Sequence, residues 1–373
     1  MAHAYTPGLK VTNRMKHSVV RMLPIKGDVM VKVGDSVVAD QIVAATYMPG
    51  DVYPLNMANL LAVPPKDVLS LMICKEGQKV EKGEAVAETA GIFGKFKKKY
   101  NSPYAGTIET VSDVTGQVIL RGPDIPVEVK AYVTGTVTDV NPEIGCTVES
   151  DVAFIQGIFG IGGETCGTIK FAVKASDEIL TASSITQDMK GCVVIGGARI
   201  TDDSIEEARK VGAVALVGGG MDDQDLKEFL GYDLGVAITG SEKKGITVIV
   251  TEGFGDIAMA NRTFDLLKRF EGHEASVKGA TQIRAGVMRP EIIIPIDSGA
   301  SEVEIEYEGG YLEIGKSLRI IRDPYFGIIG TVKALPSEPH VLGSGSKARV
   351  LEVELKTGES VIVPRANVEL IEE

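Results

Sequence analysis

The chain contains no tryptophan, few other aromatic residues and few of the side chains that usually carry metal or redox chemistry. Aromatic residues make up 5% of its 373 positions, so its cores must be built mainly from aliphatic side chains. Its four cysteines, Cys74, Cys146, Cys166 and Cys192, are widely separated and have no spacing suited to zinc or an iron–sulfur cluster. We therefore expect no metal site and no cofactor, and we expect Cys192 to be a small buried hydrophobic residue.

Long apolar runs and an excess of positive charge are also missing. No stretch approaches the ~18 apolar residues that a membrane span needs, and the first residues lack the basic and apolar regions of a signal peptide. The net charge of −12 argues against broad binding to nucleic acid or anionic lipid, because both require a local excess of cations. We therefore expect a cytoplasmic protein with no membrane contact, and we interpret the basic stretch 95–100 as a solvated loop.

Glycine is abundant, with 43 residues, and it marks a repeated phrase. Residues 33–44 return in altered form as residues 76–87, each with Gly-x-x-Val near its start and Val-Ala at its end. Apolar residues alternate around tight turns in both copies, which predicts two half-buried β-hairpins. We interpret the copies as symmetric halves of one β-module with a shared core. The alternative is two ordinary hairpins that are alike by chance.

Further strand phrases follow the second copy, so we expect β-structure throughout the first 170 residues. Ser-Pro-x-x-Gly-x-Ile stands at residues 102–108, and Gly-Thr-Val at 135–137. Together with the repeated phrase, this pattern resembles the barrel-sandwich hybrid of biotinyl and lipoyl domains, which also occurs in RNA polymerase large subunits and in the electron-transport subunit RnfC. The resemblance covers about residues 20–150 and implies an all-β fold. It does not imply carrier or redox function, because the modifiable Met-Lys-Met or Asp-Lys-Ala and the cluster cysteines are absent.

The hydrophobic period changes between residues 185 and 295. Buried-strand runs stand at residues 192–195, 213–217, 236–238, 246–250 and 291–294. Helices with capping and dipole signals are expected at 202–211, 223–230 and 257–270. Strands that alternate with helices predict βαβ units, and hence a mostly parallel sheet.

Three strand ends in this region are rich in glycine, and each precedes a helix N-terminus. Ligands of such sheets lie beyond the carboxyl ends of the strands, where free N–H groups favour an anion. The candidate ligand-binding residues are Gly196, Gly197, Arg199, Gly218, Gly219, Gly220, Thr251, Glu252, Gly253, Gly255, Arg284 and Arg289. The alternative is that the glycines merely permit tight turns. No Ser-His-Asp, Cys-His or paired-carboxylate set accompanies them, so we assign no catalytic residue.

The most specific signal lies near the C-terminus. Residues 315–332 resemble the KOW motif of NusG-type transcription factors and certain ribosomal proteins, and residues 349–370 fit the rest of a small SH3-like barrel. The resemblance implies contact with RNA or protein, for which the candidate residues are Arg319, Arg322, Tyr325 and Phe326. Residues 297–373 hold fourteen acidic and eight basic residues, a net charge of −6, so we expect a protein partner rather than RNA.

These features predict a multidomain α and β protein. We expect an all-β barrel-sandwich hybrid domain over residues 1–170, an α/β parallel-sheet domain over 171–296, and a KOW-like SH3 barrel over 297–373. The expected function is a non-catalytic binding or scaffolding subunit of a larger cytoplasmic assembly. One alternative is an RNA-binding factor that acts in transcription or translation through the C-terminal barrel. The other is an enzyme or sensor that binds a nucleotide or phosphorylated metabolite in the central domain.

Overall fold

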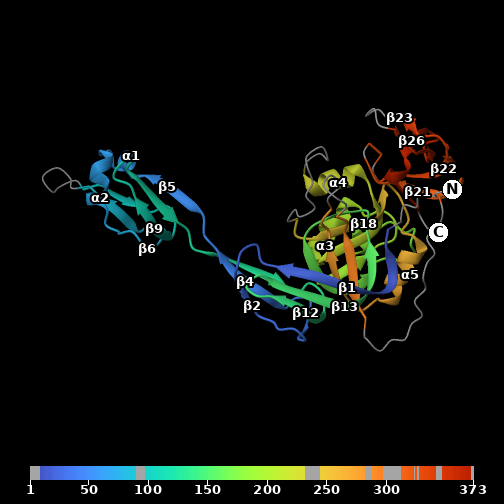
Figure 1. The fold of residues 1–373 in the computed structure, drawn as a ribbon, viewed down its shortest axis with the longest axis horizontal. Helices are drawn as coiled ribbons and strands as arrows, with labels where there is room; N and C mark the ends of the chain where they lie inside the picture. The colour runs from blue at the N-terminus through green and yellow to red at the C-terminus, as the bar shows by residue number, and fades with distance from the viewer. Residues whose placement is uncertain are drawn as a thin grey trace.

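The computed structural model describes residues 9–89, 97–231, 244–281, 288–296, 312–322, 324–325, 327–341 and 347–370. Among the described residues, 46% are in strands and 15% in helices, so this part of the protein is mostly β. Figure 1 shows an elongated molecule in which a small β-module stands apart from a larger body. Within the described ranges, no helix is long and apolar enough to cross a membrane.

One small β-unit, which we call the proximal module, lies between the body and the narrow part of the molecule (Figure 1). It contains β2 (Asp28–Val29), β3 (Ser36–Val37), β4 (Ile42–Met48), β11 (Ile125–Lys130), β12 (Gly135–Asn141) and the first part of β13 (Gly145–Gln156). Its core consists of Val31, Val37, Val43, Ala131, Val137, Cys146 and Val148. These core residues fall in two separate stretches, so the chain leaves the module and later returns to it.

The intervening residues form the distal module, at the far end of the molecule (Figure 1). Its strands are β5 (Val52–Asn56), β6 (Lys79–Val80), β7 (Ala85–Glu88), β8 (Lys99–Asn101), β9 (Gly106–Val111) and β10 (Gln117–Arg121). Two short helices, α1 (Met57–Leu61) and α2 (Val68–Leu71), interrupt the β-structure expected throughout this region. They form because Met57, Leu61 and Val68 are buried in the module's own core.

The repeated phrases fold into equivalent pairs of turns in the two modules. In each turn a backbone N–H donates to the side chain three residues later, first at Lys32 and Lys75 and again at Val38 and Glu81. Each copy then pairs with its own Gly-Thr phrase, since β3 pairs with β12 and β6 pairs with β9. The expectation of two halves with one core is therefore wrong. The second copy belongs to a separate module that is inserted within the first.

The largest sheet among the described residues has eleven strands; it forms the centre of the body and continues through β13, β12 and β3 into the proximal module. Its order is β14-β18-β17-β16-β15-β19-β20-β13-β12-β3, with β1 paired to β13. The strands not yet located are β1 (Val11–Met22), β14 (Phe159–Ile161), β15 (Glu164–Phe171), β16 (Cys192–Ile195), β17 (Ala215–Met221), β18 (Thr247–Phe254), β19 (Glu274–Lys278) and β20 (Glu291–Pro295). The domain boundary expected at residue 170 falls inside β15, and strands from both sides of it share this sheet.

The sheet is mixed, whereas the sequence predicts a mostly parallel one. Neighbours from β15 to β18 are parallel, as expected of βαβ units. The flanking pairs β14–β18, β15–β19, β19–β20 and β13–β20 are antiparallel. Cys192 is buried in β16, as predicted.

Two of the predicted helices match closely, and the third begins later. α3 (Asp202–Val211) and α4 (Asp223–Leu230) have the expected bounds, and each ends at a left-handed glycine, Gly212 or Gly231. α5 (Asn261–Arg269) begins after its predicted start, because the residues before it lie against β17 and the loop that follows β16. There the N–H of Met259 donates to the carbonyl oxygen of Gly197 at 3.1 Å. The strand predicted at 236–238 lies outside the described residues.

The C-terminal module is a small antiparallel sheet with its own core. The strands are β21 (Ser317–Ile320), β22 (Ile329–Ala334), β25 (Val350–Leu355), β26 (Ser360–Pro364) and β27 (Val368–Leu370), in the order β26-β25-β22-β21-β27. A separate pair, β23 (His340–Val341) and β24 (Lys347–Ala348), lies beside them. Arg319 of β21 stands opposite Glu369 of β27, and both are buried. Two opposite charges in a buried strand pair mark this edge of the module as a candidate functional site.

Candidate functional site at the junction of the central sheet and the C-terminal module

Arg319 is held by acceptors from the end of β18. Its side chain, on β21 of the C-terminal module, is 3% exposed. The guanidinium donates to the Glu252 carboxylate at 2.8 Å, to the carbonyl oxygen of Thr251 at 3.3 Å, and to the carbonyl oxygen of Glu252. The planar fork of arginine suits several acceptors that lie at one strand end. Arg319 therefore ties the C-terminal module to the central sheet.

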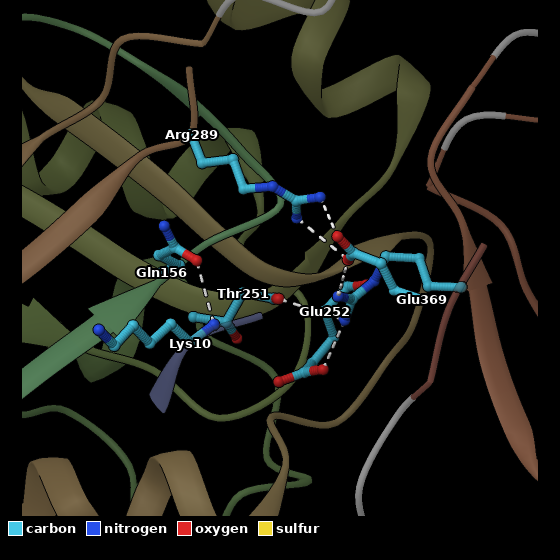
Figure 2. A network of polar contacts seen from close by, with 7 residues as sticks. Lys10, Gln156, Thr251, Glu252, Arg289 and Glu369 are labelled. Carbon is cyan, nitrogen blue, oxygen red and sulfur yellow. Dashed lines mark hydrogen bonds and ion pairs between the residues drawn. The ribbon is translucent and has the colours of Figure 1, made fainter. Parts of the chain in front are cut away.

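A second ion pair completes this arrangement. Arg289, which precedes β20, donates to both carboxylate oxygens of Glu369, one of them at 3.1 Å. Arg319 lies 3.8 Å from the same carboxylate. Figure 2 shows Glu252, Arg289 and Glu369 close together at this junction. We call Glu252, Arg289, Arg319 and Glu369 the junction network. Its two positive and two negative charges balance. The region of the central sheet and the C-terminal module each supply one charge of each sign.

Burial dominates the electrostatics of the junction network. It lowers the pKa of Arg319, and the carboxylates of Glu252 and Glu369 partly offset that effect. It raises the pKa of Glu369, and Arg289 and Arg319 partly offset that effect. Such desolvated charges are tolerated only while their partners stay in place. The network therefore favours one docked position of the C-terminal module.

The turn that contains Gly327 also contacts the end of β18. Gly327 has a φ of +82°, and a Cβ atom placed on it would lie 2.6 Å from the Phe254 ring. A Cβ atom on Gly253 would overlap the carbonyl oxygen of Gly327. Neither position has room for a side chain. Two stretches that the sequence presents as separate binding elements thus contact each other within one chain.

The other glycine-rich strand ends are covered by the protein's own backbone. The N–H groups of Gly196, Gly219 and Gly220 donate to carbonyl oxygens of neighbouring strands or loops, at 2.7 to 3.1 Å. A Cβ atom on Gly219 would lie 2.5 Å from the backbone nitrogen of Met259, and one on Gly220 would overlap the carbonyl oxygen of Gly255. These N–H groups are occupied inside the protein. Close packing against the protein's own backbone accounts for Gly219 and Gly220.

Arg199 lies apart from the junction network, among aspartates. Its distances to the carboxylates are 2.5 Å for Asp222, 3.3 Å for Asp256 and 3.6 Å for Asp225. Arg199, Asp222 and Asp256 follow β16, β17 and β18, so three neighbouring strand ends meet here, as expected of a parallel sheet. Burial and nearby carboxylates raise the pKa of Asp202 beside them. The aspartates outnumber the arginine, so this place is unfavourable for an anion.

The remaining predicted site residues are only partly accounted for. Thr251 is buried and donates its hydroxyl to the carbonyl oxygen of Gly218 at 3.2 Å. Arg322 and Tyr325 are half-buried, and Tyr325 packs against the core of the C-terminal module. Arg284 and Phe326 lie outside the described residues.

The sequence prediction does not include Glu369. A glutamate between Val368 and Leu370 fits the exposed face of an alternating strand, but all three residues are buried. Its burial depends on Arg289, which is distant in the sequence. No local pattern separates this glutamate from a solvated one.

A second polar cluster, partly buried around Tyr132 and also not predicted, joins the proximal module to the body. We call Arg21, Tyr132, Glu164, Lys278 and Glu291 the Tyr132 cluster. Tyr132 has a φ of +68°, which is rare for a bulky residue, and its hydroxyl donates to Glu291 at 3.3 Å. Arg21 lies over its ring and donates to both Glu164 oxygens, at 3.0 and 2.7 Å, while Lys278 donates to one of them at 3.1 Å. The strained backbone places the ring in a core that β13 and β20 share.

The Tyr132 cluster predicts a pH dependence of stability. Burial raises the pKa of Glu291, an effect that Glu164 increases and that Lys278, Tyr132 and Arg21 oppose. The folded protein thus holds this proton more tightly than the unfolded chain. The contribution of protonated Glu291 to the free energy of unfolding is greatest below the pKa of glutamate in the unfolded chain, about 4.3. This contribution is lost as the pH rises through the raised pKa of Glu291 in the folded protein. In urea unfolding from pH 4 to 8, the free energy of unfolding of Glu291→Gln should rise relative to that of the parent chain as the pH rises. A pH-independent difference between the two would contradict this account.

One open cleft, of about 550 Å³, lies on the proximal side of the body. The hydroxyl groups that line it are those of Ser36, Thr134, Thr136 and Ser150. Its carboxylates are already paired, Glu149 with Lys16 at 3.2 Å and Asp151 with Arg14 at 3.0 Å. In the ranges that the structure describes, no group of three or more His, Cys, Asp or Glu side chains is arranged to hold a metal ion.

Comparison with known proteins gives no family for this chain. No protein-family model matches it, and no curated protein matches it. The geometry of the junction network and the arrangement of the modules therefore carry the inference of function.

Proposed function

We propose that the chain is a non-catalytic scaffolding subunit of a larger cytoplasmic assembly, which it joins through protein contacts. The observation that supports this best is the intramolecular use of the predicted binding elements. Arg319 pairs with Glu252, and Gly327 lies against Gly253. Groups that a ligand or RNA would otherwise contact instead fix one module on another. A chain built this way is suited to hold several surfaces in defined positions.

We also propose fold types for the three smaller parts. The proximal and distal modules are barrel-sandwich hybrids of the biotinyl and lipoyl type, one inserted in the other. The equivalent turns at Lys32 and Lys75 and the equivalent pairings of β3 and β6 support this. The C-terminal module is an SH3-like barrel of the KOW type. In this proposal the distal module contributes a partner-binding surface and carries no cofactor.

The two alternative functions have less support. For RNA binding, Arg319 is buried, and Tyr325 is packed against the module's own core. For a phosphorylated ligand, the N–H groups of Gly219 and Gly220 are occupied, and carboxylates surround Arg199. Each alternative thus loses several of the groups that motivated it.

Cross-linking in cells, followed by mass spectrometry, tests the scaffold proposal. The probe is the full-length tagged chain, and the matched control replaces residues 49–124 with an Asn-Gly turn between the paired residues Met48 and Ile125. We expect the same protein partners in replicate experiments, and we expect a partner that binds the distal module to be missing from the control. A chain that stays monomeric and yields no cross-linked partner would contradict the proposal. Salt-sensitive binding of single-stranded RNA, weakened by Arg322→Ala, would instead favour the RNA alternative.

A further inference from the structure

The connection between the proximal and distal modules is a two-stranded ribbon, which we call the neck (residues 49–51 and 122–124; Figure 1). On the proximal side Met48 pairs with Ile125, and on the distal side Val52 pairs with Arg121. Both sides have the same register, because three residues separate the paired positions on each strand. β4 with β5, and β10 with β11, therefore form one ribbon that is interrupted at the neck.

The composition of the neck explains the interruption. One strand reads Pro-Gly-Asp at 49–51, and the other reads Gly-Pro-Asp at 122–124. The backbone bond that the structure shows across the neck runs from the N–H of Gly122 to the carbonyl oxygen of Asp51, at 2.8 Å. The Gly122–Asp51 bond makes position 49 a hydrogen-bonded position of the alternating antiparallel ladder and position 123 a non-bonded one. Proline has no backbone N–H, so Pro49 removes a ladder donor.

The strands touch at the neck through glycine backbone. A Cβ atom on Gly50 would overlap the carbonyl oxygen of Gly122. The flanking side chains face solvent, with Tyr47 69% exposed, Val52 48% and Ile125 48%. Among the residues that the structure describes, the cores of the two modules have none in common. An isolated two-stranded ribbon without such support is only marginally stable.

We propose that the neck is a hinge about which the distal module turns relative to the body. The paired strands on either side keep each module intact, and the few residues between them absorb the change in backbone angles. The body is held together by the junction network and the Tyr132 cluster, so the motion is confined to the neck. A hinged distal module presents its surface in more than one direction. The hinge does not depend on which partner binds, so it can fail while the scaffold proposal stands.

Distance measurements between spin labels on the full-length chain test the hinge. The neck pair places one label at Val114→Cys, where the parent side chain is 81% exposed, and one at Lys210→Cys on α3. The control pair, Lys16→Cys with Lys210→Cys, lies entirely outside the distal module. Both use a chain in which the half-buried Cys166 is replaced by serine. We expect a distinctly wider distance distribution for the neck pair than for the control pair.

Two further variants assign the motion to the neck. Pro49→Thr restores the missing donor and should narrow the neck-pair distribution. Arg121→Ala removes a bond of 3.3 Å to the carbonyl oxygen of Gly50 and should widen it, which gives a second test if the first variant does not fold. A neck pair as narrow as the control pair would overturn the proposal. A wide distribution that neither variant changes would also overturn it, because the motion would then lie elsewhere.

Discussion

Replacement of Arg319 by methionine is expected to weaken docking of the C-terminal module by about 3–5 kcal/mol, the usual cost of breaking a buried ion pair. Methionine retains much of the side-chain volume, but it takes away the cation that pairs with the buried Glu252 and leaves Glu369 paired with Arg289. The loss should appear as faster hydrogen exchange at Ala260, whose N–H donates to the Glu252 carboxylate at 3.2 Å. It should also lower the midpoint of unfolding in guanidinium chloride.

Two matched variants separate this effect from the loss of any arginine. Arg209 pairs with Glu206 on the exposed face of α3, so Arg209→Met should cost no more than about 1 kcal/mol. Arg319→Lys keeps the charge but lacks the planar fork, so it should fall between Arg319→Met and the parent chain. If Arg319→Met were no more damaging than Arg209→Met, the junction network would have no part in docking.

Replacement of Gly219 by alanine is expected to destabilise the body by about 1–3 kcal/mol or more, the range for added atoms in a packed core. The new Cβ atom would lie 2.5 Å from the Met259 nitrogen and 2.8 Å from the Ala258 carbonyl carbon, and backbone atoms cannot move aside as a side chain can. Thermal and urea unfolding should both show the loss. A ligand-binding glycine would behave differently, since alanine there would reduce binding and leave unfolding nearly unchanged.

Gly163→Ala is the control for this substitution. Apart from its own chain neighbours, no atom of the described residues lies within 4 Å of the Cβ position at Gly163, and its φ is not positive. The substitution should therefore be close to neutral. Equal stability of the Gly163 and Gly219 variants would refute the packing role of Gly219.

Elements with local signals were predictable from the sequence. The helix over 202–211 combines acids in its first turn, bases in its last and Gly212 at its end, and it forms with those bounds. The pairing of the repeated hairpins was not predictable. Val37 and Val80 sit in like patterns, and choosing which distant Gly-Thr phrase each one joins requires contacts that local periodicity does not encode. The nested modules could be recognised only from the strand pairing.

The candidate site was predictable only in part, because local patterns mark its residues but do not reveal their distant partners. Glycine at a strand end marks a close approach, but the pattern is the same whether a ligand or the chain's own backbone approaches, as Gly219 and Gly253 illustrate. Arg319 stood out as a charged residue in a strand motif, but its partner Glu252 belongs to another part of the chain. Contacts between segments distant in the sequence determine both what approaches the glycines and what pairs with Arg319.

A double-mutant cycle between Arg319 and Glu252 tests the junction network most directly. Arg319→Met, Glu252→Gln and the double variant are compared with the parent chain by hydrogen exchange, which reports local opening at the junction. Partners in a buried network should be coupled, so the double variant should be more stable than the sum of the single effects predicts, by about 0.5–3 kcal/mol. Additive effects would contradict the account, because Arg319 and Glu252 would then not act together to hold the C-terminal module on the central sheet.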